Sequence, residues 1–198
     1  MTNNQVSARC AIVALLCSVT SMTWAEDVDL DAVRAATEKY KHVSAAIGDG
    51  YIRDPADHCV EAAAEGLPAE WGGMGIHYIH PALLGITAGK PKVDGNGTHT
   101  DWMRPAILLY EPQAGGTLEL VGVENLVWQS GWADTQKPVP EINGKAWDAM
   151  ADNPETEVDE AHNFMPHYDQ HIWLFRENPM GVLHPFNPNV SCKHHAGH

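Results

Sequence analysis

The sequence predicts an α+β fold in which N-terminal helices pack on an antiparallel β-sheet or an open barrel. Three observations lead to this prediction. Apolar residues recur every three or four positions between Val33 and Ile47, which is the period of an amphipathic helix. From Trp71 onward the apolar runs are short and separated by glycine and proline, which is typical of strands and turns. Residues 26–198 are long enough for a core of their own, and we expect a single domain there.

Two helices are expected before the sheet. Asp27 or Asp29 can cap the first helix, which ends at Gly48. An alanine-rich second helix over residues 57–65 ends at Gly66. The strands that follow are expected near residues 75–79, 106–111, 117–128 and 171–176.

Residues 1–25 predict a signal peptide. One cation, Arg9, precedes an apolar run over residues 11–17, and small residues lead to a cleavage position after Ala25. The apolar run is too short to span a bilayer. An amphipathic or buried N-terminal helix is the alternative. We therefore expect a periplasmic or secreted protein with no membrane attachment after cleavage.

Removal of that segment leaves two cysteines, Cys59 and Cys192. In an oxidising compartment two cysteines most simply form one disulfide, and two free thiols are the alternative. Closing so long a loop would stabilise the fold by about 4 to 5 kcal/mol if the effect is entirely loss of chain entropy in the unfolded state.

The composition is strongly acidic, with a formal net charge of -14. This charge argues against binding to nucleic acid or to anionic membranes, because both require cationic patches. It favours cation binding, although solubility alone also accounts for it. The sequence contains neither a G-x-S-x-G motif nor a phosphate-binding loop.

Two further segments have unusual composition. Residues 130–162 form a long connection rich in proline, acids and asparagine, and such a loop is usually either functional or disordered. The tail, residues 193–198, holds three histidines and could bind Ni, Cu or Zn weakly.

Polar residues interrupt the apolar faces of the predicted strands at four positions. These are His77, Glu111, Glu124 and His171. Because side chains alternate along a strand, Glu124 is expected on the same face as Leu120, and His171 on the same face as Trp173 and Phe175. Each of the four polar side chains thus occupies a position where an apolar side chain is expected.

Burial of these groups requires compensation, because an isolated buried carboxylate costs several kcal/mol or becomes protonated. One solution is a divalent transition metal bound by all four residues. Mixed imidazole and carboxylate ligands suit Fe, Mn or Zn, and Cu is a poorer match because no thiolate is present. The alternative contains no metal and pairs each glutamate with a neighbouring cation such as Arg104, Arg176 or a histidine.

His167 and Asp169 precede His171, the first residue of the last predicted strand, and the three form the motif H-x-D-x-H. If the strand begins that early, the three side chains share a face. His167 would then be a further ligand, and Asp169 would orient a ligating imidazole by contacting the side of the ring that points away from the metal. In the alternative, His167 and Asp169 lie in solvent at the entrance to the strand.

Several motifs occur together: GMGIHY at residues 73–78, LLYEP at 108–112, LVGVE at 120–124, HYDQHIWLF at 167–175, NP at 178–179 and PFNPNVSC at 185–192. In this combination the chain resembles a family of exported bacterial proteins with no established activity. The resemblance implies one domain and export, and it implies no function. The sequence departs from the family at Asn125, Gln170 and Phe175, where an aromatic residue, leucine and tryptophan are more common.

The residues therefore predict a periplasmic or secreted metalloprotein. An open coordination position would allow an oxidoreductase to bind dioxygen or a hydrolytic enzyme to activate water. Two alternatives remain open. One is a metal- or small-ligand-binding protein without turnover, and the other is an interaction module whose buried polar residues are structural.

Overall fold

The computed structural model describes residues 27–196, so the predicted signal peptide and the last two residues of the tail lie outside the described residues. The main strands are β1 (Ile52–Arg53), β2 (Cys59–Glu61), β3 (Gly73–Ile79), β6 (Ile107–Pro112), β7 (Leu118–Trp128), β10 (Asp148–Met150) and β11 (His167–Ile172). Two small hairpins pair β4 (Ile86–Ala88) with β5 (Asp94–Gly95) and β8 (Glu141–Ile142) with β9 (Lys145–Ala146). The helices are α1 (Leu30–Thr37), η1 (Glu38–Lys41), α2 (Val43–Gly48), η2 (Ala62–Glu65), η3 (Ala69–Trp71), α3 (Pro81–Leu84) and α4 (Gln129–Asp134).

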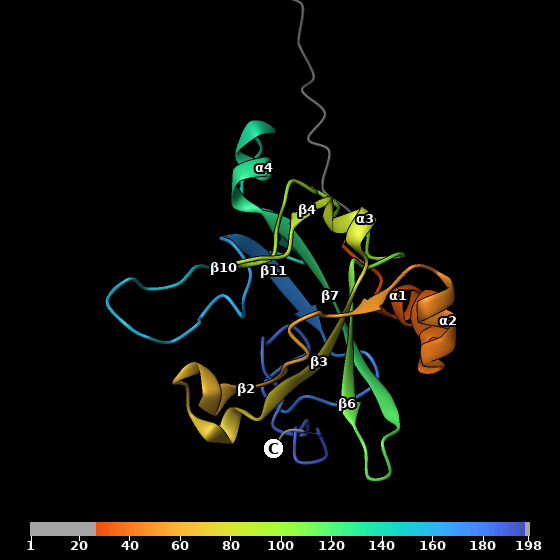
Figure 1. Cartoon of the computed structure of the whole chain (residues 1–198). Coiled ribbons are helices and arrows are strands. Elements are labelled where there is room, and N and C mark those ends of the chain that lie inside the picture. Colours follow the sequence, from red (N-terminus) through yellow and green to blue (C-terminus); the bar gives the residue numbers. More distant parts are fainter. Residues whose placement is uncertain (1–26, 197–198) are drawn as a thin grey trace, which may run out of the picture.

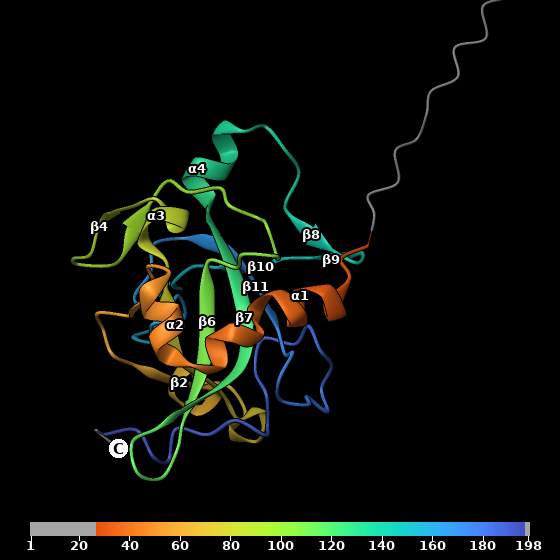
Figure 2. The same cartoon turned by 90° about the vertical axis from the view of Figure 1, so that its right-hand side faces the viewer.

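A seven-stranded antiparallel sheet forms the centre of the fold (Figure 1). Its strand order is β1-β3-β6-β7-β11-β10, and β2 also pairs with β3. The sheet is open, and α1 and α2 lie on the same side of it (Figures 1 and 2). The predicted α+β class is thereby confirmed, with a sheet rather than a closed barrel. No helix in the described part of the chain is long and apolar enough to cross a membrane.

The N-terminal helical region differs in detail from the prediction. Asp29 caps α1 by accepting hydrogen bonds from the backbone N–H groups of Asp31 and Ala32. The expected single helix is divided into α1, η1 and α2, and the extended backbone of His42 separates η1 from α2. The expected second helix is wrong: its residues form β2 and a short 3₁₀ turn, because pairing with β3 outweighs the helix propensity of alanine.

The two faces of the sheet bury separate apolar clusters. On the first face Val33 and Tyr40 from the helical region pack with Tyr110, Val123 and Ile172 from the strands. The Tyr110 hydroxyl donates a hydrogen bond of 2.6 Å to the carbonyl oxygen of Tyr40. The second face carries a different set, which includes Ile79, Ile107, Leu109, Leu126, Trp128 and Trp173. Strand alternation places His77, Glu124 and His171 on this second face, away from the N-terminal helices.

An extra residue in β7 changes which side chains share a face. Leu109 pairs with Gly122 and Tyr110 pairs with Leu120, so Val121 has no partner of its own. Leu120 consequently packs with the first cluster and Val121 with the second. The expectation that Leu120 shares the face of Glu124 is therefore wrong.

Strand β11 begins and ends earlier than predicted. Its ladder with β7 starts at His167 and ends at Ile172. Beyond this point the N–H of Trp173 bonds to Val182 and that of Phe175 to Val121. Phe175 packs with the first cluster, so the expectation that it shares a face with His171 is also wrong.

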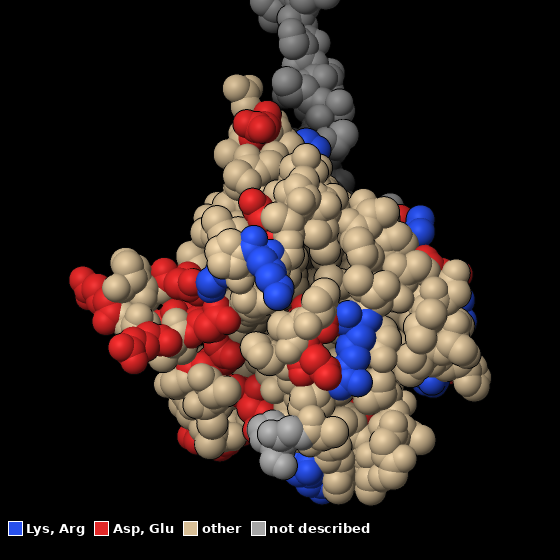
Figure 3. Space-filling model, in the orientation of Figure 1, with Lys and Arg blue, Asp and Glu red and all other residues tan. Residues whose placement is uncertain are grey.

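The long acidic connection contributes to the fold. It contains most of α4, the β8–β9 hairpin and β10, and β10 extends the sheet beside β11. Acidic side chains gather on the side of the molecule where the loop after β10 lies (Figures 1 and 3).

The predicted disulfide between Cys59 and Cys192 is confirmed, with a Cα–Cα distance of 5.7 Å. It links β2 to the C-terminal segment. The two residues are 133 positions apart, so the bond closes most of the described chain into one loop.

Candidate metal site

Three predicted ligands meet on the second face of the sheet. His77 comes from β3, Glu124 from β7 and His171 from β11. Glu124 and His171 are direct partners in the β7–β11 ladder. Strand β6 lies between β3 and β7 and carries only Ile107 and Leu109 beneath the group. The site is therefore built on regular strands in the interior of the sheet.

The side-chain atoms of this group converge on one point. Nε2 of His77 is 3.3 Å from Oε2 of Glu124, and Nε2 of His171 is 3.4 Å from the same oxygen. One ligand atom from each residue lies within 4.8 Å of the others. Two ligands about 2.1 Å from one ion at a tetrahedral angle are about 3.4 Å apart, so these distances suit a shared first-row metal ion.

The same atoms lack other partners. Glu124 Oε2 and both ring nitrogens of His171 are buried and make no hydrogen bond to any described residue. The exposed fractions of the Glu124 and His171 side chains are 3% and 1%. Buried polar atoms without hydrogen bonds are rare because each costs free energy. A bound cation would satisfy several of these atoms at once, which is why the residues fit a metal ion.

Burial also sets the protonation states of the group. It raises the pKa of Glu124 to about 7, with His171 acting in the opposite direction. Burial lowers the pKa of His77 to about 4. It lowers the pKa of His171 as well, against the attraction of Glu124. Both imidazoles are consequently neutral at pH 7, which is the form that binds metals.

His167 and Asp169 lie beside this group on the same face of β11. Their exposed fractions are 1% and 2%, so the alternative that placed them in solvent is wrong. His167 donates from Nδ1 to the carbonyl oxygen of Met165 at 2.8 Å, and its Nε2 lies 3.7 Å from Oδ2 of Asp169. Burial acts to raise the pKa of Asp169, but contact with His167 and the nearby histidine charges lower it overall. Asp169 thus contacts His167, and Nε2 of His167 is not among the three converging atoms.

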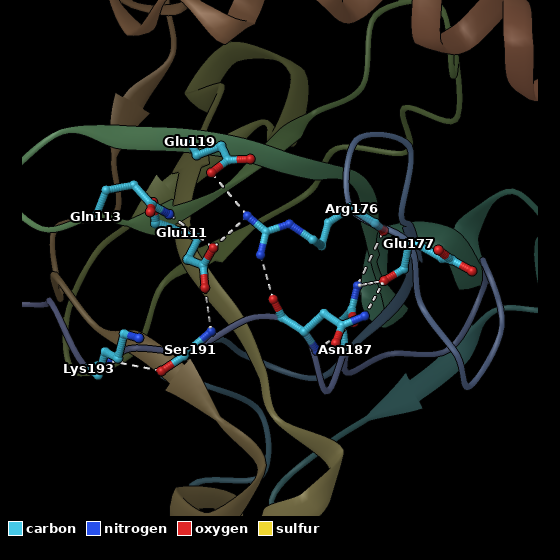
Figure 4. A network of polar contacts seen from close by, with 9 residues as sticks. Glu111, Gln113, Glu119, Arg176, Glu177, Asn187, Ser191 and Lys193 are labelled. Atoms are coloured by element: carbon cyan, nitrogen blue, oxygen red, sulfur yellow. Dashed lines mark hydrogen bonds and ion pairs between the residues drawn. The ribbon is translucent and has the colours of Figure 1, made fainter.

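Glu111 does not join the group, which corrects the expected set of four ligands to three. Its Oε2 lies 2.7 Å from the Arg176 guanidinium and accepts from Gln113, and its Oε1 accepts from the backbone N–H of Ser191 (Figure 4). For this glutamate the alternative of pairing with Arg176 is the one that holds. Leu109 is the residue that pairs with His77. Because Glu111 lies two residues farther along β6, its carboxylate is displaced along the strand away from His77.

One residue that was not predicted as part of the site completes its surroundings. His162, from the long acidic connection, lines a small cavity together with His77, Glu124, His167 and Asp169. The cavity volume is about 10 Å³, room for roughly one water molecule or ion. His162 has no periodic or motif context in the sequence, and only the folded chain brings it here.

The described part of the histidine-rich tail does not form a comparable group. Among the described residues, His77, Glu124 and His171 are the one set of three metal-ligating side chains whose atoms lie this near to one another. His195 instead contacts Arg53 and Asp57.

No family model, curated protein or solved structure matches this chain. The interpretation of the site therefore depends on its own geometry.

Proposed function

We propose that this protein is an exported metalloprotein in which His77, Glu124 and His171 bind one divalent transition metal ion. The observation that carries the proposal is the convergence of three buried side chains whose central oxygen, Glu124 Oε2, has no hydrogen-bond partner among the described residues. Replacing one of the three by an apolar residue would remove a ligand and would leave the other two buried polar side chains without a cation to offset the cost of their burial.

The ligand set favours particular metals. Two imidazoles and one carboxylate suit Fe(II), Mn(II) or Zn(II), and the absence of a thiolate among the three makes Cu a poorer match. Three protein ligands leave coordination positions for water or substrate, as in catalytic rather than structural sites. An ion there would supply Lewis-acid or redox chemistry for a hydrolytic or oxidative reaction.

A metal-binding protein without turnover is the second candidate. The cavity beside the ligands, about 10 Å³, has space for little more than the ion itself. A substrate would reach the ion only after a wall residue moves. Retention of the metal with no exchangeable coordination position would favour this second candidate.

The second part of the proposal is export. The Cys59–Cys192 disulfide is consistent with an oxidising compartment. The predicted signal peptide and the family resemblance point in the same direction. The intact mass of periplasmic or secreted material is expected to match a chain that begins near Glu26 and to be lower by two hydrogen atoms because of the disulfide.

Metal analysis of protein purified without a histidine-affinity column tests the site. The wild type is expected to hold one equivalent, and His77→Gln and His171→Gln are expected to lose it while circular dichroism shows a folded protein. His42→Gln is the matched control, since His42 is exposed. Retention of the metal by both site variants, or its loss on deletion of residues 193–198, would overturn the proposal.

A further inference from the structure

A second cavity opens to solvent beside the metal site. Its volume is about 360 Å³, and β2, η2 and the end of the acidic connection form its walls. We call it the outer pocket, and its lining includes Asp57, His58, Val60, Ala64, Glu65 and His162. Its volume lies at the lower end of the range for small-molecule sites.

The outer pocket and the small inner cavity share three wall residues. His58, Val60 and His162 line both of them. His77 and Glu124 line the inner cavity as well. The outer pocket and the cavity that holds the metal ligands therefore adjoin at His58, Val60 and His162.

His162 and Glu65 have buried polar atoms without hydrogen-bond partners at this wall. Nδ1 of His162 lies 3.2 Å from Oε1 of Glu65, and the His162 side chain is only 10% exposed. Nε2 of His162 and Oε2 of Glu65 are buried and have no hydrogen-bond partner among the described residues. Buried polar atoms are normally paired, so this wall fits a ligand that carries hydrogen-bonding groups.

The charge of the lining indicates the kind of ligand. Asp57, Glu65 and Asp159 line the pocket together with His58, His162 and His195, and none of its lining residues is lysine or arginine. Asp57 pairs with Arg53 and Asp159 with Lys92, so their charges are partly balanced from outside. Acidic side chains also gather on this side of the surface (Figure 3). A concave acidic surface raises the local concentration of cations and repels anions.

We propose that the outer pocket is the entrance and ligand pocket of the metal site, that it takes cations and small hydrogen-bond donors in preference to anions, and that His162 contacts the ligand. The inference depends on the proposed metal site. It adds the route to the ion and the chemical class of what passes along it.

The neighbouring alanines of η2 provide a matched test. Ala64 lines the pocket, whereas Ala63 is exposed and does not. Stopped-flow absorbance is used to follow Co²⁺ uptake by the metal-free, disulfide-intact protein. Ala64→Trp is expected to slow uptake by about tenfold, within the range over which association rates vary, and Ala63→Trp to leave it within about twofold. His162→Ala is expected to accelerate uptake. All variants keep the final spectrum because the three ligands are unchanged.

Two non-ligating solutes of similar size test the charge preference. Methylguanidinium is a hydrogen-bond-donating cation, and methanesulfonate is an anion. At equal ionic strength methylguanidinium is expected to slow Co²⁺ uptake by the wild type and to have little further effect on Ala64→Trp, while methanesulfonate has none on either. Equal inhibition by both solutes would contradict the charge preference.

The results separate the two proposals. If the wild type takes up no Co²⁺, the metal site fails and the route fails with it. If the wild type takes up one equivalent and Ala64→Trp does so at the same rate, the metal site stands and the outer pocket is not its entrance.

Discussion

Glu124 and His171 are direct partners across the β7–β11 ladder, and Oε2 of Glu124 lies 3.4 Å from Nε2 of His171. A shift of β11 by one residue would move His171 to the other face of the sheet. The ladder prevents this over its whole length, from the His167–Trp128 pair to the Ile172–Val123 pair. The register of the sheet therefore positions the two ligands before any ion binds.

Glu124→Gln is expected to stabilise the metal-free protein at pH 8 and to have much less effect at pH 4.5. The pKa of Glu124 rises on folding from 4.5 to about 7, so folding disfavours its charged form. Its penalty is absent below the unfolded-state pKa, grows between the two values and is complete above about pH 7, where it reaches roughly 3 kcal/mol. Urea unfolding of both proteins at the two pH values measures the difference. An equal effect at both would show that Glu124 is not buried as a carboxylate.

Metal binding is expected to release protons near neutral pH. About half of the Glu124 carboxyls are protonated at pH 7, the pKa that burial gives this group, whereas both histidines are already neutral. Affinity should therefore fall as the pH drops below about 7 and change little above it. Titration calorimetry of Zn²⁺ binding in buffers with different ionisation enthalpies counts the protons. A fall that begins only near pH 4 would assign the linkage to His77 instead.

Glu111→Gln is expected to destabilise the protein without loss of the metal. The substitution weakens the contacts of Glu111 with Arg176 and Ser191, and a hydrogen bond that involves a charged group contributes about 1.5 to 3 kcal/mol. Urea unfolding of the metal-free form measures the stability, and metal analysis measures the stoichiometry. Loss of the metal from a folded Glu111→Gln variant would restore Glu111 as a ligand.

Side-chain alternation within each strand is sufficient to identify His77, Glu124 and His171 as polar side chains at positions where apolar ones are expected. That the three share one face depends on the register of β3, β6, β7 and β11. Alternation fails where a strand is irregular. The extra residue at Val121 puts Leu120 on the other face, and Phe175, which lies beyond the end of β11, packs with the first cluster. Neither departure has a local sequence signal, since a bulge depends on pairing with the neighbouring strand.

The role of Glu111 and the position of His162 depend on contacts between distant parts of the chain. Arg176 and Ser191 reach Glu111 from segments far along the sequence. His162 reaches the site through a connection that the sequence shows only as acidic. The helix expected over residues 57–65 fails for a similar reason, because β2 pairs with β3 and its cysteine bonds to Cys192.

His167 is expected to tune the site rather than to complete it. Nε2 of His167 faces Asp169 at 3.7 Å, and the converging atoms belong to other residues. His167→Gln and Asp169→Asn should each keep one equivalent of metal, and Asp169→Asn should also lower the affinity because it removes a buried negative charge that acts on His171. Competition with a chromophoric chelator measures the affinity, and His42→Gln serves as the control. A complete loss of metal in folded His167→Gln, similar to that expected for His171→Gln, would instead make His167 a direct ligand.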